Sequence, residues 1–329
     1  QADMVVLAIG VTPDTVLAKE AGLELGIKES IVVNDRMETS VPDIYAAGDA
    51  VQVKHYVTGN DALISLAGPA NKQGRIIADN ICGGDSHYLG SQGSSVIKVF
   101  DMTAATTGIN ETNAKKSGLE VDTVILSPMS HAGYYPGGKV MTMKVVFEKE
   151  TYRLLGAQII GYEGVDKRID VLATAIHAGL KATQLKDLDL AYAPPYSSAK
   201  DPVNMAGFMI DNIAKGTLKQ WHLEDMDKIS RDKSVVLLDV RTVGEFNRGH
   251  MDGFKNIPVD ELRERINEIE KGKPVYLICQ SGLRSYIASR ILEGNGYETY
   301  NFSGGFRFYD AVVNDRALIE KAYACGMDY

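Results

Sequence analysis

The sequence predicts an α/β protein built from three parts, and three observations support this prediction. Over residues 1–90, apolar runs that end in small residues alternate with helical patterns, as expected for a sheet buried on both faces. Over residues 91–217, strands with alternating polar and apolar residues begin near Ser95 and indicate an α+β domain. Within residues 218–329, a strand, a loop and a helix follow one another directly. The chain's 329 residues are enough for two or three separate cores.

Composition and charge narrow the class of protein. Hydrophobic residues make up 45% and charged residues 24%, as in ordinary globular proteins, and no apolar run is long enough to cross a membrane. The net charge of -8 argues against nucleic acid as a partner. The three cysteines, Cys82, Cys279 and Cys325, favour a reducing compartment, so we expect a cytoplasmic protein. His177 and His222 have no companion ligands nearby in the sequence, and no metal site is predicted.

The first part is expected to begin with strands. Met4–Gly10 is a nearly continuous apolar run that ends in glycine, which predicts a strand buried on both faces. Two further strands are predicted at Ser30–Asp35 and Thr39–Ala50. Because the chain opens at Gln1, without a methionine and close to an expected strand, we interpret it as the C-terminal part of a longer protein.

A strand end and a helix start predict a cofactor site in this first part. The small residues before Gly48 let a ligand approach the backbone at the carboxyl end of a strand, where open α/β sheets bind ligands. The carboxylate of Asp49 can accept hydrogen bonds from sugar or ribitol hydroxyls there. A helix is predicted to begin within Leu66–Arg75, with Pro69 in its first turn, and its N-terminus can stabilise negative charge. A plain loop after a core strand is the alternative interpretation.

The stretches Thr39–Ala50 and Leu66–Arg75 resemble the second FAD-binding motif of the pyridine nucleotide-disulfide oxidoreductases. The resemblance implies a partial FAD/NAD-binding, Rossmann-like region, with FAD as cofactor and NAD(P)H as reductant. In that family the aspartate that matches Asp49 contacts the ribitol or pyrophosphate region of FAD. The residues that the resemblance places at the cofactor are Gly48, Asp49, Leu66, Ala67 and Pro69.

The middle part is predicted to combine a sheet with helices. Strands are predicted at Val96–Phe100, Thr123–Leu126, Val140–Phe147 and Thr151–Gly161. The last two are expected to pair antiparallel, and apolar residues between 169 and 180 then share one face of a helix. Another helix is expected to begin at Pro202. This α+β unit is similar to the dimerisation domain of the same oxidoreductases, which implies a homodimer.

Two segments rich in tyrosine narrow the resemblance. His131–Gly138 and Leu190–Pro202 look like segments of the coenzyme A-disulfide reductases, in which one tyrosine from each segment reaches the partner subunit's redox cysteine. The resemblance assigns these roles to Tyr134 and Tyr192, and it implies coenzyme A as a ligand. A phenol hydroxyl can donate a hydrogen bond to a thiolate, as disulfide reduction requires. Other candidates in the two segments are Tyr135 and Tyr196. Tyrosines beside prolines can also simply pack an interface.

Cys279 lies where a complete catalytic loop is predicted. Pro274–Ile278 predicts a buried strand and Ser285–Leu292 a helix, so the cysteine falls in the turn between them. Backbone N–H groups of such a turn and the helix N-terminus favour the nucleophilic thiolate. Gly282 lets the loop close around the sulfur, and Arg284 can bind an anionic donor such as thiosulfate or a persulfide. A buried structural cysteine is the alternative.

The segment Cys279–Ser285 resembles the active loop of the rhodaneses, sulfurtransferases that carry sulfane sulfur as a cysteine persulfide. Further matches to the family pattern are Leu237–Arg241, Glu245–His250 and Asn256–Pro258. The related phosphatases use a longer loop, so the short spacing from cysteine to arginine favours sulfur chemistry. The resemblance implies a C-terminal α/β rhodanese domain with Cys279 and Arg284 as catalytic residues.

Together the resemblances imply an NAD(P)H- and FAD-dependent reductase of coenzyme A disulfide, coenzyme A persulfide or polysulfide, coupled to sulfur transfer through a Cys279 persulfide. The family's N-terminal glycine-rich fingerprint, its redox cysteine and its NAD(P)H turn are not found in the sequence, so we expect no NADH turnover by this chain alone. Cys82, at an expected helix end, is predicted to be structural, and Cys325 incidental. The alternatives are a stand-alone thiosulfate or persulfide sulfurtransferase, an NADH oxidase or peroxidase-type flavoenzyme, and a scaffold with an inert rhodanese loop.

Overall fold

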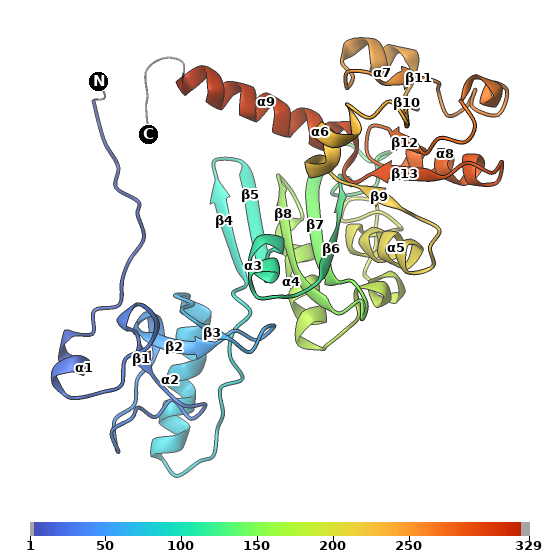
Figure 1. Cartoon of the computed structure of the whole chain (residues 1–329). Helices are drawn as coiled ribbons and strands as arrows, with labels where there is room; N and C mark the ends of the chain where they lie inside the picture. The colour runs from blue at the N-terminus through green and yellow to red at the C-terminus, as the bar shows by residue number, and fades with distance from the viewer. Residues whose placement is uncertain (1–2, 324–329) are drawn as a thin grey trace. The chain divides into compact units, whose positions relative to one another are not determined.

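The computed structural model describes residues 3–323, with side chains described up to residue 314. Contacts divide the chain into two compact units, Gln1–Ser95 and Val96–Tyr329, and the described strands form three sheets (Figure 1). The predicted α/β class is confirmed. The domain borders at 90/91 and 217/218 stay a prediction, and Cys325 lies outside the described residues. Within residues 3–323, no helix is both long and apolar enough to span a membrane.

The first unit contains a small sheet and one long helix. Its elements are α1 (Val16–Glu20), η1 (Ile27–Glu29), β1 (Ile31–Val32), η2 (Gly48–Ala50), β2 (Val51–Lys54), β3 (Asp61–Ala62) and α2 (Ala67–Ile81). β1 pairs parallel with β2, and β2 pairs antiparallel with β3. Met37, Val51 and Val53 form the buried core of this sheet. The predicted strand at Ser30–Asp35 and the helix that begins near Leu66 are confirmed.

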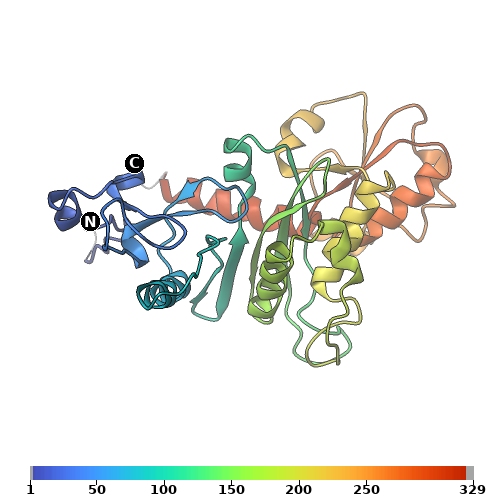
Figure 2. The ribbon, with the colours of Figure 1, turned by 90° about the horizontal axis from the view of Figure 1, so that it is seen from below.

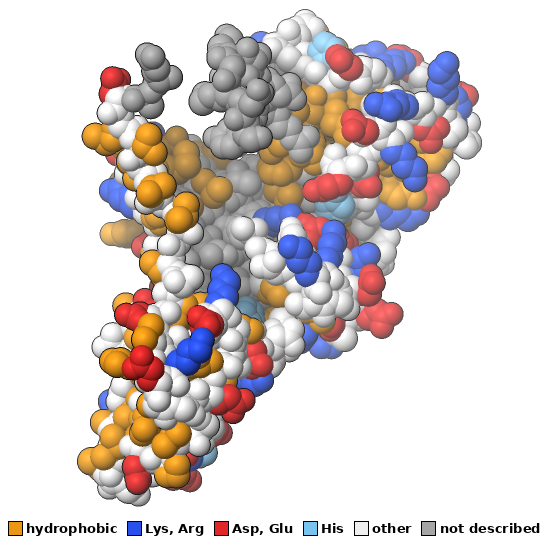
Figure 3. Space-filling model, turned by 60° about the vertical axis from the view of Figure 1, so that its left-hand side comes forward, with side chains coloured by type: hydrophobic (Ala, Val, Ile, Leu, Met, Phe, Trp, Pro, Cys, Tyr) orange, Lys and Arg blue, Asp and Glu red, His pale blue; other side chains and the backbone are white. Residues whose placement is uncertain are grey.

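Two strand predictions in the first unit are wrong. Residues 4–10 form no strand, and their apolar side chains, among them Leu7 and Ile9, are exposed. Figure 3 shows hydrophobic side chains, in orange, on the surface of the first unit. The hydrophobic pattern was strand-like, but a strand also needs a hydrogen-bonded neighbour, and no described strand lies beside it. Thr39–Ala50 is a turn followed by η2, because Asp43 has a left-handed φ of 65° that reverses the chain.

The second unit begins with a five-stranded sheet covered by helices. Its strands are β4 (Ser95–Val99), β5 (Met102–Gly108), β6 (Val121–Leu126), β7 (Met141–Glu148) and β8 (Leu154–Gly161). They lie in the order β4-β5-β8-β7-β6, and β7 pairs antiparallel with β8 as predicted. The helices are α3 (Glu111–Lys116), α4 (Val165–His177), η3 (Ala182–Asp187) and α5 (Pro202–Ala214). α4 contacts β5 and β8 along one face of the sheet (Figure 2).

A parallel sheet forms the last part of the second unit. Its strands are β9 (Gln220–Trp221), β10 (Val236–Asp239), β11 (Lys255–Asn256), β12 (Val275–Ile278) and β13 (Thr299–Phe302). Their order is β11-β10-β12-β13-β9, and every pairing is parallel. The helices are η4 (Leu223–Asp225), α6 (Met226–Ile229), α7 (Val243–Arg248), η5 (Ile266–Glu268), α8 (Leu283–Glu293) and α9 (Gly305–Tyr323). Because all strands run the same way, the residues that follow β10 and β12 meet at one edge.

Buried polar contacts join the two sheets of the second unit. The backbone N–H of Ile125, in β6, donates to the hydroxyl of Ser303 at 3.0 Å in a buried position. The side-chain amide of Gln220 donates to the carbonyl of Thr123 at 3.2 Å. His222 lies 3.3 Å from the carboxylate of Asp122. β6 therefore packs against the start of the parallel sheet.

Candidate functional site

Two tyrosines from distant segments meet in the middle part of the chain. The hydroxyl of Tyr134 lies 2.7 Å from that of Tyr192, within hydrogen-bonding distance. Both side chains are exposed, at 77% and 44%, so a ligand can reach them. The hydrogen bond with Tyr134 raises the pKa of Tyr192 above its ordinary value. The two tyrosines that sequence reasoning selected are thus brought together, while Tyr135 packs edge-on against the ring of His131.

A buried arginine ties the two tyrosine segments together. Arg168, in α4, is 1% exposed and donates to the carboxylate of Asp201 at 3.0 and 3.2 Å. It also donates to the carbonyl of Ser130, at 2.9 Å, in the segment that carries Tyr134. Further bonds reach the carbonyl of Tyr196 and the hydroxyl of Ser197 in the segment that carries Tyr192. One guanidinium group therefore fixes both segments relative to α4.

A cavity of ≈ 470 Å³ opens beside Tyr192. Its lining includes Tyr192, Tyr196, Lys167, Arg168 and His131. The Lys167 ammonium donates to the carbonyl of Ala191 at 3.3 Å and so supports the segment just before Tyr192. The cavity is large enough for part of an organic ligand, and its walls offer phenol, imidazole and ammonium groups for polar contacts.

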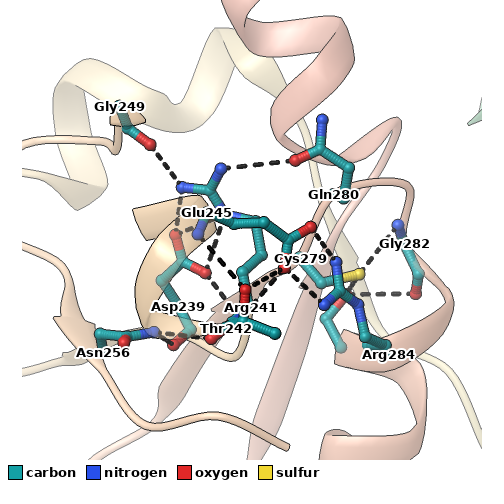
Figure 4. A network of polar contacts seen from close by, with 11 residues as sticks. Asp239, Arg241, Thr242, Glu245, Gly249, Asn256, Cys279, Gln280, Gly282 and Arg284 are labelled. Carbon is teal, nitrogen blue, oxygen red and sulfur yellow. Dashed lines mark hydrogen bonds and ion pairs between the residues drawn. The ribbon is translucent and has the colours of Figure 1, made fainter. Parts of the chain in front are cut away.

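Cys279 follows β12 directly and precedes α8, as the sequence predicted (Figure 4). The strand forms because Val275 to Ile278 are branched or aromatic residues that fill the centre of a parallel sheet. The cysteine is 0% exposed and packs in a cluster with Leu238, Val240, Leu277 and Ala288, among others. This burial fits a structural cysteine as well as a catalytic one. The polar contacts of the sulfur distinguish the two interpretations.

Two donors point at the sulfur of Cys279. The N–H of Gly282 lies 3.1 Å from Sγ, and the hydroxyl of Ser285 lies 3.2 Å from it. Both come from the turn that begins α8, so the helix N-terminus adds its partial positive charge. The Ser285 hydroxyl is also 3.1 Å from the carbonyl of Gly282, which gives its proton two acceptors. The sulfur therefore has two hydrogen-bond donors in addition to its apolar neighbours, whereas a purely structural cysteine needs none.

The chain after β13 holds this loop in place. The N–H of Phe306 donates to the carbonyl of Cys279 at 2.8 Å, and that of Arg307 to the carbonyl of Gln280 at 3.2 Å. Asn301, in β13, donates to the carbonyl of Gly282 at 3.1 Å. Gly305 lies so close that a Cβ there would be 2.7 Å from the Cα of Ser281. The loop conformation therefore depends on residues well beyond the loop itself.

Arg284 is not free to bind a donor in this structure. Its two terminal nitrogens each donate to a carboxylate oxygen of Glu245 at 2.7 Å (Figure 4). Hydrogen bonds from Arg284 lower the pKa of Glu245 to about 2. The hydrogen bond with Glu245 raises the pKa of Arg284, and the nearby Cys279 contributes as well. The predicted anion-binding arginine is thus present next to Cys279 but carries a bound carboxylate.

A second arginine is fully paired beneath the loop. Arg241, which follows β10, is bound by the carboxylate of Asp239 at 2.7 Å and donates to the carbonyl of Gly249 at 2.7 Å. Its guanidinium also stacks on the ring of Phe306, 3.8 Å from the centroid. Arg241 and Asp239 are both buried. Because Arg241 also donates to the side-chain carbonyl of Gln280 at 3.4 Å, it links the end of α7 to the Cys279 loop.

The first unit brings together the residues predicted to contact a flavin. Gly48 adopts a φ of 86°, which glycine tolerates without strain, and a Cβ there would lie 3.9 Å from Ala70 in the first turn of α2. No side chain caps the N-terminus of α2 at Leu66, and Ala67 is exposed, so its N–H groups can meet an anion. The Asp49 carboxylate is exposed beside this helix start. The donor set fits a cofactor that carries hydroxyl groups and develops negative charge.

Sequence reasoning missed three residues of these sites. Ser285 was included in the predicted active loop but was given no role, and Glu245 and Arg168 contact residues 39 and 33 positions away. A capping box, Thr242 with Glu245, was a sequence signal that could have placed Glu245 on the first turn of a helix. Cys82, predicted to be structural, is exposed at the end of α2 and does not pack in a core.

Family models match three segments of the chain. Residues 1–74 match the pyridine nucleotide-disulphide oxidoreductase model, and residues 94–202 match the dimerisation domain of the same family. Residues 222–311 match the rhodanese-like domain. The chain thus combines oxidoreductase segments with a C-terminal rhodanese-like domain, as the sequence motifs predicted.

The chain is similar to several known proteins. The NAD(P)H sulfur oxidoreductase (CoA-dependent) of Pyrococcus abyssi is 39% identical over 203 residues, which are 62% of this chain and 45% of that protein. The crystal structure of reduced Bacillus anthracis CoADR-RHD is 48% identical with a TM-score of 0.93, covering 96% of this chain and 57% of that one. The NAD-dependent persulfide reductase from A. fulgidus is 42% identical with a TM-score of 0.86, over 94% and 56% of the two chains. The chain spans about half the length of these relatives.

Proposed function

We propose that this chain, which joins segments of the pyridine nucleotide-disulfide oxidoreductase family to a rhodanese-like domain, is part of a coenzyme A-disulfide or persulfide reductase. Its substrates would be coenzyme A disulfide, coenzyme A persulfide or polysulfide, with FAD and NAD(P)H as cofactors. The names of its relatives, a CoA-dependent sulfur oxidoreductase and a persulfide reductase, support this proposal.

The observation that carries the proposal is the contact between the hydroxyls of Tyr134 and Tyr192, 2.7 Å apart. Two phenols that share one hydrogen bond can offer a proton to a thiolate that leaves a disulfide. Arg168 keeps the two segments in position from the buried side. Tyr192 also lines a cavity that would take the sulfur-bearing end of coenzyme A.

The first unit would hold the flavin. Gly48 and the uncapped start of α2, with Leu66, Ala67 and Pro69, would approach the cofactor through their backbone, and Asp49 would accept bonds from its hydroxyls. When bound, FAD would supply the transfer of reducing equivalents from NAD(P)H to a disulfide. The chain's own contribution is to bind, orient and stabilise negative charge.

The Cys279 loop would carry sulfur. The thiolate, stabilised by Gly282 and Ser285, would attack the outer sulfur of a persulfide or thiosulfate. A bond forms between Sγ and that sulfur, and the donor's S–S bond breaks. The bonding electron pair leaves with the thiol or with sulfite, and the terminal sulfur of Cys279 holds the negative charge. A second thiol then takes up this sulfur and regenerates the thiolate.

We also propose a homodimer in the cytoplasm. Residues 94–202 match a dimerisation domain, which supports self-association. A reducing compartment would keep the Cys279 thiol available for sulfur transfer.

The reductase proposal is tested on the natural full-length protein with NADH. Coenzyme A disulfide and coenzyme A persulfide should be reduced faster than oxygen or peroxide is, and Tyr134→Phe with Tyr192→Phe should slow the disulfide reaction. Faster turnover of oxygen or peroxide would instead support an oxidase or peroxidase.

A sulfurtransferase activity of the chain alone is a second candidate, favoured by the two donors to Sγ. Incubation with thiosulfate and a thiol should yield persulfide or sulfide, and Cys279→Ser should abolish the reaction. Equal activity in this variant would contradict a role for the loop.

A further inference from the structure

The Arg284–Glu245 pair is built more firmly than an ordinary surface ion pair. The contact is bidentate, with both distances 2.7 Å, and the two side chains are 31% and 21% exposed. Exposed ion pairs with one flexible contact contribute little to stability, whereas bidentate arginine–carboxylate pairs are stronger. The pair is partly exposed to solvent and lies beside Cys279 (Figure 4).

Glu245 is held in place independently of Arg284. Its carboxylate accepts from the backbone N–H of Thr242 at 3.0 Å and from the Thr242 hydroxyl at 2.9 Å. The Thr242 hydroxyl in turn accepts from the N–H of Glu245, which completes a capping box at the start of α7. The carboxylate therefore stays beside Arg284 whether or not a ligand competes for the guanidinium.

The other arginine at the loop cannot replace Arg284. Arg241 is bound by Asp239 and by the carbonyl of Gly249, and it stacks on Phe306. Of the two guanidinium groups in Figure 4, each is matched by one carboxylate. The N–H of Gly282, at the start of α8, points at the Cys279 sulfur and is not engaged by a carboxylate.

We propose that Glu245 determines which sulfur donors load Cys279, because it occupies both nitrogens of Arg284 that an oxyanion would need. Thiosulfate carries two negative charges next to the sulfur that is transferred. It must displace Glu245 or approach an uncompensated carboxylate, and both are unfavourable. A persulfide presents its outer sulfur with at most one charge and needs no bidentate partner. The loop therefore favours persulfides over thiosulfate. This inference rests on the proposed sulfur transfer through Cys279.

The test compares Glu245→Gln with the unaltered chain. Glutamine is compatible with the capping box, so the start of α7 should be kept while the charge is removed. The rate of sulfur loading on Cys279 is measured by intact mass, once with thiosulfate and once with glutathione persulfide. We expect the thiosulfate-to-persulfide rate ratio to rise about tenfold, as one charge at ~6 Å and an effective dielectric constant of roughly 40 would give.

Two further variants separate the effect of the Glu245 charge on loading from a general effect of the substitution on the domain. Glu264→Gln removes the same charge from an exposed site in the same domain, and should leave the ratio unchanged. Glu245→Asp withdraws the carboxylate from Arg284, and the ratio must rise by a smaller factor. This second variant decides the matter if the glutamine variant does not fold.

The outcomes test donor selection by Glu245 separately from sulfur transfer through Cys279. A ratio that stays at the wild-type value in folded Glu245 variants overturns the role of Glu245 while sulfur transfer stands. No loading of Cys279 by either donor, in any variant, overturns the sulfur-transfer proposal itself.

Discussion

The phenol hydroxyls of Tyr134 and Tyr192 lie 2.7 Å apart, although 58 positions separate the two residues in the chain. Neither tyrosine lies in a helix or strand, so their meeting depends on the segments that carry them. Those segments are fixed by Arg168, which reaches both. The tyrosine pair and the buried arginine can therefore be tested separately.

Removing the Tyr134 hydroxyl should make Tyr192 ionise at lower pH. The hydrogen bond with Tyr134 raises the pKa of Tyr192, and Tyr134→Phe removes this cause. The measurement is the titration of the Tyr192 ring carbon by NMR with labelled tyrosine. Tyr135→Phe, in the same segment, serves as the control. An unchanged titration in the Tyr134 variant would show that the pair does not form in solution.

Replacing Arg168 with methionine should destabilise the second unit by about 3–5 kcal/mol, because the Asp201 carboxylate would be left buried without its partner. Urea denaturation measures the free energy of unfolding. Lys116→Met removes an exposed cation from the same unit and should change that free energy by less than about 0.5 kcal/mol. Similar small changes in both variants would mean that the arginine does not hold the segments.

Ser285→Ala should slow sulfur loading of Cys279 by about 10- to 100-fold, the effect of losing one hydrogen bond to a charged group. Ser289→Ala is the matched control, since that serine is buried in the same helix but bonds the carbonyl of Tyr286. Single-turnover loading with a persulfide donor gives both rates. Equal loading rates in the Ser285→Ala and Ser289→Ala variants would show that the Ser285 hydroxyl does not stabilise the Cys279 sulfur.

Gly305→Ala should displace the Cys279 loop. Its Cβ would lie 2.7 Å from backbone atoms of Ser281, so the loop or the start of α9 must move. Gly272→Ala shares the positive φ but has no atom within 4 Å of the added Cβ. Both should lose about 1–2 kcal/mol of stability from backbone strain, but only the first should also lose sulfur transfer. Loading at the wild-type rate in folded Gly305→Ala would contradict this dependence.

Glu245 should make stability depend on pH in the acid range. Its pKa is about 2 in the folded chain against an ordinary 4.5, so its contribution is present above pH 4.5 and is lost as the pH falls toward 2. Glu245→Gln should therefore lose less stability than the wild type between pH 4.5 and 3. Urea denaturation at several pH values measures this difference. Parallel curves for the two chains would show that the ion pair contributes nothing.

The Cys279 loop was predictable because its signals are local. A strand of branched residues, a cysteine and a helix start follow one another within Val275–Glu293, and each can be recognised from neighbours in sequence. The antiparallel pair β7 and β8 was predictable for the same reason, since a short turn joins them. The donors to Sγ also come from this stretch.

Contacts between distant residues could not be predicted in this way. Nothing near Glu245 in the sequence indicates that its carboxylate binds Arg284 rather than solvent. The run at residues 4–10 has the composition of a buried strand, yet burial depends on a neighbour that composition does not specify. In Thr39–Ala50, the positive φ of Asp43 overrode the strand pattern. The tyrosine pair was chosen by resemblance, and its hydrogen bond was not foreseen.

The buried bond between Ile125 and Ser303 has a consequence for how sulfur would travel. Ser303 lies two residues before Gly305, which packs closely against Ser281 of the Cys279 loop, so the loop is anchored to β6. A loop that is anchored in this way cannot swing away from its sheet to deliver the sulfur that it holds. In the proposed sulfur transfer, sulfur loaded at Cys279 would therefore leave on a small thiol that diffuses from the loop to the site of reduction.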